Sequence, residues 1–258
     1  MSVLTWILLF SLLGGVLSVL VAALFLLIDE QRRTAMLPHF VSFAIGALLG
    51  AALLGLLPRA LAAQDVSGPE LIPLTVLLGL LLFFMLEKMV LWRHCHVDDC
   101  EFHVPDHNPV QSSAGFLILV GDGMHNFVDG ILIGAAFLTD IHLGIVTSLA
   151  VAAHEIPQEV GDFAVLLHSG FTRQRAFIYN ILSSLTTVVG GVLAYYSLTE
   201  LQHFLPFVLA MAASSFLYVA VADLIPGLHK RVEAAATLQQ ILLIGIGVLV
   251  IYGVQNLL

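Results

Sequence analysis

Two groups of side chains that can bind metal ions lie about thirty residues apart, both within strongly apolar segments of the chain. The first group consists of Asp122, His125, Asn126 and Asp129. The second group consists of His154, Glu155, Gln158, Glu159 and Asp162. Residues three and four apart share one face of an α-helix, so each group predicts a polar stripe on a helix. Imidazole and carboxylate ligands suit Zn²⁺, Fe²⁺, Mn²⁺, Co²⁺ and Cd²⁺, and the lack of thiolate in the stripes disfavours Cu⁺.

The composition places these stripes in a lipid bilayer. The chain has 258 residues, of which 59% are hydrophobic and only 10% are charged, and a soluble domain cannot bury that much apolar surface. Eight segments approach the roughly 20 residues that a bilayer core requires. They are residues 4–28, 38–62, 72–92, 114–138, 143–168, 176–197, 204–226 and 238–256. We therefore predict an all-α polytopic membrane protein, a bundle of eight transmembrane helices forming a single domain over residues 1–258.

The basic residues predict the orientation of the bundle. Eight of the nine Lys and Arg residues follow the first, third, fifth and seventh spans or lie near those ends. They are Arg32, Arg33, Lys88, Arg93, Arg173, Arg175, Lys230 and Arg231. By the positive-inside rule this side is cytoplasmic, so both termini are expected outside. Arg59 is the exception, at the outer end of the second span.

Acidic groups inside the predicted spans account for part of the net charge of −9. Besides the acids of the two stripes, Asp223 falls within the seventh span. A charged group at the centre of a membrane helix costs about 2.5–3.5 kcal/mol on insertion scales and normally needs a partner. Basic side chains are lacking around these acids, so protons or a bound cation must compensate them. Pro157 also predicts a kink near residues 153–154, because proline removes a backbone donor and crowds the carbonyl four residues earlier.

Both stripes resemble the motifs of a known family. The sequence HNFVDG at residues 125–130 resembles the HNFxDG motif in the fourth helix of the ZIP (Zrt-, Irt-like protein) metal transporters. The sequence HEIPQEVGD at residues 154–162 resembles their fifth-helix motif HExPHExGD, and ADLIP at residues 222–226 is similar to a segment of their seventh span. The resemblance extends over nearly the whole chain, including the eight-span arrangement and the histidine-rich loop after the third span.

The resemblance implies a ligand set for a transported ion. This set comprises His125, Asn126, Asp129, His154 and Glu155, together with Gln158, which replaces the usual His or Glu of the family. An amide is a weaker, neutral ligand, so altered affinity or selectivity is expected rather than lost transport. Four further acids are expected along the ion pathway or around the ligands, namely Asp122, Glu159, Asp162 and Asp223. Some family members hold a second metal with a carboxylate from the sixth span, but residues 176–197 contain no acid.

The polar loop 93–113 carries another concentration of metal-binding side chains. His94, Cys95, His96, Cys100, His103 and His107 lie within this loop. Such density can bind Zn²⁺ or similar ions through His and Cys. The spacing does not enforce a tetrahedral structural site, so we interpret the loop as a loose acceptor or regulatory site on the cytoplasmic side.

These observations favour a transporter, not an enzyme. The resemblance implies movement of a divalent metal, zinc first and iron, manganese or cadmium as alternatives, into the cytoplasm by an elevator-type alternation of access. One alternative is an intramembrane zinc metalloprotease, because His154 and Glu155 begin like HExxH. Gln158 occupies the second His position of that motif, and Pro157 disrupts its helix. Another alternative is an exporter of a different family, which usually has six spans and a soluble metal-binding domain.

The remaining expectations concern partners and location. The transported divalent metal and the lipid bilayer are the expected partners, with a homodimer as a fair expectation and no role for nucleic acid. The transported ion itself is the only small molecule that the function requires, so no cofactor is expected. We predict an integral protein of a bacterial inner membrane.

Overall fold

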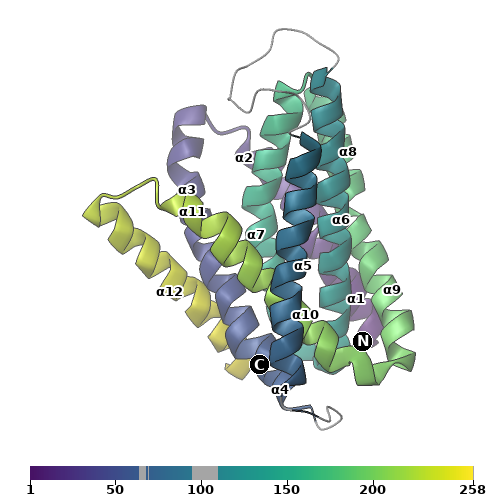
Figure 1. Ribbon diagram of the computed structural model, residues 1–258. Helices are drawn as coiled ribbons and strands as arrows, with labels where there is room; N and C mark the ends of the chain where they lie inside the picture. The colour runs from purple at the N-terminus through teal and green to yellow at the C-terminus, as the bar shows by residue number, and fades with distance from the viewer. Residues whose placement is uncertain (64–67, 69, 95–109, 258) are drawn as a thin grey trace.

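The protein is a bundle of helices, as the computed structural model in Figure 1 shows. The structure describes residues 1–63, 68, 70–94 and 110–257. The α-helices are α1 (Val3–Gly14), α2 (Val16–Phe25), α3 (Glu30–Gly50), α4 (Leu57–Leu61), α5 (Leu71–His94), α6 (Val110–Thr139), α7 (Ile141–His168), α8 (Arg173–Ser184), α9 (Thr186–Glu200), α10 (Leu205–Tyr218), α11 (Ile225–Leu228) and α12 (Ala234–Leu257). Two π-helical turns, η1 (Ala51–Leu56) and η3 (Val219–Leu224), and the 3-10 turn η2 (Gln202–Phe204) complete them. The prediction of an all-α protein is confirmed over these residues.

Six helical segments are long and apolar enough to cross a membrane in the part of the chain that the structure describes. They are Val3–Phe25, Glu30–Leu61, Leu71–Met89, Arg173–Glu200, Gln202–Leu228 and Ala234–Asn256. The two helices that carry the polar stripes, α6 and α7, are 30 and 28 residues long and match the predicted spans 114–138 and 143–168, but they are not among the six. Large apolar side chains are exposed along α5 and α12, for example Leu77, Leu78 and Ile241. On helices long and apolar enough to cross a bilayer, such surfaces are typical of contact with lipid, so the protein is an integral membrane protein.

The first and sixth predicted spans are each divided into two helices. The first breaks at Gly15, between α1 and α2, and the sixth breaks at Leu185, between α8 and α9. The two breaks lie against each other, since a Cβ on Gly15 would stand 2.6 Å from the carbonyl oxygen of Ser184. Only a residue without a side chain allows this approach.

Proline explains the π-helical turns. Pro58 and Pro226 each follow such a turn by two residues, and the N–H of the residue before each proline bonds to a carbonyl five residues back. Proline lacks an N–H and crowds the carbonyl four residues earlier, so the helix widens by one residue. For Pro58 that carbonyl belongs to Leu54, and Gln255 of α12 donates to it from Nε2 at 3.0 Å. The freed backbone acceptor is thereby satisfied by a side chain of the neighbouring helix α12.

Close contact between α6 and α9 fixes the position of the first stripe. Gly130 of α6 lies against the backbone of Thr187, and Gly190 of α9 lies against the carbonyl of Phe127. Small residues at a helix crossing let the two backbones approach closely in a membrane. Gly130 serves in this way, whereas Gly121 and Gly161, which also flank the stripes, have nothing within 4 Å of where a Cβ would stand.

The two ends of the chain lie at the same end of the bundle (Figure 1). The opposite end holds the last residue of α5, His94, and the first of α6, Val110. The loop residues Cys95, His96, Cys100, His103 and His107 lie outside the described residues, so the loop metal site stays a prediction. α7 continues as one helix through Pro157, and the kink predicted there also stays a prediction.

Candidate metal centre

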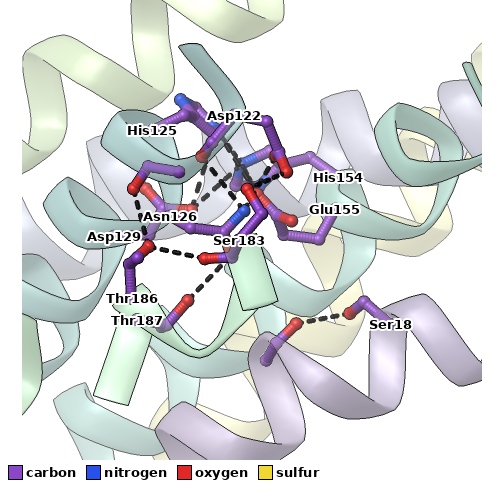
Figure 2. A network of polar contacts seen from close by, with 12 residues as sticks. Ser18, Asp122, His125, Asn126, Asp129, His154, Glu155, Ser183, Thr186 and Thr187 are labelled. Atoms are coloured by element: carbon purple, nitrogen blue, oxygen red, sulfur yellow. Dashed lines mark hydrogen bonds and ion pairs between the residues drawn. The ribbon is translucent and has the colours of Figure 1, made fainter. Parts of the chain in front are cut away.

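The middle portions of α6 and α7 bring the two polar stripes face to face (Figure 2). His125 Nε2 lies 3.2 Å from His154 Nε2 and 3.5 Å from Glu155 Oε1. Asp129 Oδ2 lies 3.3 Å from His154 Nε2. One ligand atom from each of these four residues lies within 4.8 Å of the others. We call these four residues the histidine cluster.

Burial makes the charges of the histidine cluster costly. Asp129 and His154 are each 1% exposed and Glu155 is fully buried, whereas the side chain of His125 is 24% exposed. Both oxygens of Asp129 and both of Glu155 are buried with no hydrogen-bond partner among the described residues. An unpaired buried carboxylate is strongly unfavourable unless it is protonated or binds a cation. The arrangement therefore fits a divalent ion held by imidazole and carboxylate ligands.

Backbone contacts orient His154 for such a role. Its Nδ1 lies 3.0 Å from the carbonyl oxygen of Ala150, one turn earlier on α7. The carbonyl only accepts, so Nδ1 is the donor and carries the ring proton of the neutral imidazole. The lone pair is then on Nε2, which points at Asp129 and Glu155. Metal-binding histidines are usually oriented by such a bond from the other ring nitrogen.

Asn126 is occupied by protein contacts. Its Nδ2 donates to Asp122 Oδ1 at 2.9 Å, and its Oδ1 accepts from the Thr187 hydroxyl at 2.7 Å. The structure therefore places Asn126 as a support for Asp122, and its role as a metal ligand stays a prediction. Gln158 is half-buried one turn beyond His154 on α7, where its role as a ligand also stays a prediction.

The acids predicted along the pathway are not equivalent. Asp122 and Glu159 are buried and lie with Glu155 in a second group, whose ligand atoms are also within 4.8 Å of one another. Asp162 is half-buried on α7. Asp223, in η3, is exposed. The structure thus brings two of the four pathway residues directly beside the histidine cluster.

Comparison with known proteins gives the family. The family model described as ZIP Zinc transporter matches residues 103–255. The chain belongs to the ZIP family. Zinc transporter ZIP13 of Pongo abelii is 32% identical over an alignment of 252 residues, gaps included, that covers 92% of this chain and 73% of that relative. Zinc transporter ZIP10 of Danio rerio is 43% identical over an alignment of 129 residues, gaps included, that covers 47% of this chain.

The lengths of these ZIP relatives differ widely. The alignment covers only 15% of the ZIP10 of Danio rerio and 18% of the ZIP10 of Homo sapiens. The relatives are named as transporters, in agreement with the prediction that this ZIP protein is not an enzyme. Membership of this family therefore disfavours the metalloprotease alternative. Residues 125–130 and 154–162, which carry the family resemblance, lie inside the matched region.

Hydroxyl groups from the sixth span are part of the ZIP site that the sequence analysis missed. Ser183 donates to Asp122 Oδ2 at 2.5 Å, Thr187 donates to Asn126, and Thr186 donates to the carbonyl of Gly123 at 2.6 Å. The sequence does contain a pattern that could have indicated these hydroxyls, because Ser183 and Thr187 are four residues apart and so form a short polar stripe. This span contains no acid, so ligand chemistry alone did not indicate the contribution of its hydroxyls. Glu87, on α5, is another acid that was not among the predicted site residues. Its carboxylate accepts a hydrogen bond from the Tyr218 hydroxyl.

Arg59, which the distribution of the other basic residues left as an exception, has a partner in the ZIP bundle. Its Nη2 lies 3.7 Å from Asp140 Oδ1, with the two side chains 40% and 32% exposed. Asp140 also caps α7, because its Oδ1 accepts from the backbone N–H of Leu143 at 3.0 Å. The arginine therefore compensates a helix-capping carboxylate between α4 and α7.

We expect Asp140→Ala to lower the free energy of unfolding by about 1 kcal/mol, mainly through loss of the helix cap. Asp140→Ser keeps a capping oxygen and loses only the exposed ion pair, which is worth about 0–1 kcal/mol. The free energy of unfolding of Asp140→Ser should therefore be closer to that of the wild type than the value for Asp140→Ala. Thermal unfolding of the purified proteins in detergent measures the difference. Equal melting temperatures for the two variants would show that the cap is unimportant.

Proposed function

We propose that the protein transports a divalent transition metal across the membrane, with Zn²⁺ as the first candidate and Fe²⁺, Mn²⁺ and Cd²⁺ as alternatives. The observation that carries this proposal is the histidine cluster. Two imidazoles and two carboxylates converge there within a membrane bundle, and the carboxylate oxygens lack hydrogen-bond partners among the described residues. The names of the relatives, which are zinc transporters, support the same choice of substrate.

The proposed topology has eight spans, with α6 and α7 added to the six apolar segments. At 1.5 Å per residue, helices of 30 and 28 residues reach about 40–45 Å, enough to cross a bilayer. The buried polar residues of their stripes lie close together between the two helices, away from the surface that would face lipid. The distribution of basic residues places the loop 93–113 in the cytoplasm and both termini outside. The metal then moves inward, towards the loop.

An elevator-type alternation of access is the proposed mechanism. In it, α1–α2, α6, α7 and α8–α9 move together against α3–α4, α5, α10–α11 and α12. The packing supports this division, because α6 packs mainly on α9 and α7, whereas α3 packs on α12 and α10 packs on α5 and α4. The histidine cluster lies wholly within the first group of helices. An ion bound there would be carried with them.

The proposed location and assembly rest on the sequence. A homodimer and a bacterial inner membrane stay predictions, and the relatives reported above are animal proteins. The cytoplasmic loop would serve as a loose acceptor for the ion, through the His and Cys residues given above. The driving force is a gradient of the metal or of another ion.

Metal uptake into proteoliposomes tests the transport proposal. The full chain is reconstituted, and entry of Zn²⁺, Cd²⁺, Mn²⁺ or Fe²⁺ is followed with a metal-sensitive dye inside the vesicles. Saturable entry of at least one of these ions, absent from empty vesicles, is expected. Metal that bound to the protein without entering would contradict transport. Metal transport only away from the proposed cytoplasmic side, which carries the loop 93–113, would favour an exporter instead.

Gln158 provides a test of the ligand set. We expect Gln158→His to tighten Zn²⁺ binding about tenfold, equivalent to about 1.4 kcal/mol, because imidazole is a better zinc ligand than an amide. The matched control is Gln202→His, which makes the same change at an exposed position in η2. Competition with a zinc-binding indicator dye measures the Zn²⁺ affinity of both variants and of the wild type. Equal tightening in the two variants would show that residue 158 is not at the metal.

A further inference from the structure

An open groove lies between α6 and α8, which pack side by side (Figure 1). Its volume is about 400 Å³, within the range of about 300–1,000 Å³ that is usual for small-molecule sites. Most of its lining is apolar or aromatic and consists of Phe116, Leu119, Val120, Phe171, Tyr179 and Leu182. We call it the α6–α8 groove. We propose that it binds an acyl chain of an anionic phospholipid, whose phosphate is held by Arg175.

The walls of the α6–α8 groove suit a hydrocarbon chain. Phe116 is 63% exposed and Leu182 is 55% exposed, although each lies where the two helices meet. Phe171 and Tyr179 form another part of the wall, packed edge to face with their ring centroids 5.7 Å apart. Gly115 lets Phe171 lie close to α6, because a Cβ there would stand 2.7 Å from the ring. An acyl chain in the groove would cover apolar surface that these helices leave exposed.

One face of α8 carries both an arginine and part of the groove. Arg175 and Tyr179 are four residues apart, and Leu182 follows Tyr179 by three, so all three side chains share this face. The arginine is one turn nearer than Tyr179 to the start of the helix. A phospholipid with its chain against Tyr179 and Leu182 therefore places its phosphate beside Arg175.

The start of α8 has positive charge available for such a phosphate. Arg173 and Arg175 are both exposed in its first turn. Among the described residues, the ion pairs of arginine are made with Asp29 and Asp140, and neither involves α8. Guanidinium groups bind phosphate with two parallel hydrogen bonds. In the proposed topology this end of α8 is cytoplasmic, where the leaflet carries anionic lipids and basic pockets between helices bind their headgroups.

The α6–α8 groove also reaches the support of the candidate metal centre. Ser183 is part of its lining, and the hydroxyl of Ser183 donates to Asp122 Oδ2 at 2.5 Å (Figure 2). A bound acyl chain would therefore lie against the turn of α8 that positions Asp122. The inference goes beyond the transport proposal, and lipid binding can be measured whether or not the protein moves metal.

Native mass spectrometry tests the phosphate contact. The purified full chain is titrated with phosphatidylglycerol or with phosphatidylcholine of the same acyl chains, and bound lipid is counted. Wild type should bind one phosphatidylglycerol more tightly than phosphatidylcholine. Arg175→Gln should weaken phosphatidylglycerol binding about fivefold, as expected for one basic residue at a membrane surface, and leave phosphatidylcholine binding unchanged. The control Arg33→Gln removes an arginine of α3 on the same side of the bundle and should match wild type.

Leu182→Trp tests the acyl-chain contact in the same titration. A bulky ring fills the α6–α8 groove, so the tight lipid adduct should be lost. The control Val189→Trp adds the same ring at an exposed position of α9 and should keep the adduct. Since both positions are exposed, neither change should unfold the protein, which size-exclusion chromatography checks. Val120→Trp fills the groove from α6 and should repeat the loss.

Three results would overturn the proposal. Equal binding of the two lipids by wild type would show that the phosphate is not recognised. Lipid adducts retained by both Leu182→Trp and Val120→Trp would show that the chain lies elsewhere. A wild-type dimer that these two variants dissociate would place a second copy of the chain in the groove instead. Failure of the transport proposal is distinct, because it appears as absent metal uptake whatever lipid the protein binds.

Discussion

His154→Ala is expected to lower Zn²⁺ uptake into proteoliposomes more than about 100-fold. Removing a residue that merely supports a metal ligand typically costs 10–100-fold in affinity or activity, and His154 is placed as a ligand itself. The substitution removes one of two imidazoles and leaves Asp129 and Glu155 buried without a nitrogen neighbour on α7. Initial rates of uptake over a range of Zn²⁺ concentrations measure the effect.

His168→Ala is the matched control for this substitution. His168 also lies on α7 and also contacts, through Nδ1, the carbonyl oxygen four residues earlier, at 2.8 Å from Ala164. It is exposed at the end of the helix, away from the histidine cluster. Its loss should leave uptake within about twofold of wild type, as expected for a surface change. Similar uptake by the two variants would mean that the transported ion does not depend on His154.

Gly130→Ala is expected to destabilise the folded protein by about 3 kcal/mol, at the upper end of the usual cost of overpacking. A Cβ at this position would overlap the backbone of Thr187, which cannot move aside as a flexible side chain can. The helices α6 and α9 would have to separate, and the hydrogen bond from Thr187 to Asn126 would lengthen with them. Thermal unfolding in detergent, followed by size-exclusion chromatography, measures the loss.

Gly121→Ala tests whether this cost comes from packing. Gly121 is on the same helix but has nothing within 4 Å of where its Cβ would stand. Alanine should therefore be neutral or stabilise the helix by about 0.5–1 kcal/mol. If both substitutions lowered the melting temperature equally, the close contact with α9 would not be the reason.

The sequence predicts the helices and the two polar stripes well, because both depend on local patterns. Long apolar segments and the spacing of His125 with Asp129, or of His154 with Glu155, are visible without any tertiary structure. The assignment of α6 and α7 as membrane spans, and with it the count of eight, stays a prediction. The polar residues of their stripes keep these two helices out of the set of strongly apolar segments. The breaks at Gly15 and Leu185 were missed because each depends on contact with the other.

The sequence also could not show which side chains from distant helices contact the candidate site. Ser183 and Thr187 are ordinary residues in an apolar span, and their importance comes from lying against Asp122 and Asn126. Arg59 does not follow the pattern of the other basic residues, and only the structure shows that Asp140 lies beside it. The position of Asn126 in the motif predicts a metal ligand. The motif alone does not show that its amide already makes hydrogen bonds with Asp122 and Thr187.

The unequal exposure of the two histidines has a consequence for the kinetics of binding. The side chain of His125 is 24% exposed, whereas that of His154 is 1% exposed. In the proposed metal site, an arriving ion would exchange its first water molecule for His125 and would reach His154 only after it had lost more of its hydration. His125 would then govern how often an encounter leads to capture, and His154, with Asp129, would govern how long the ion stays. Because affinity is set by the ratio of these two rates, capture could be adjusted at one histidine and retention at the other.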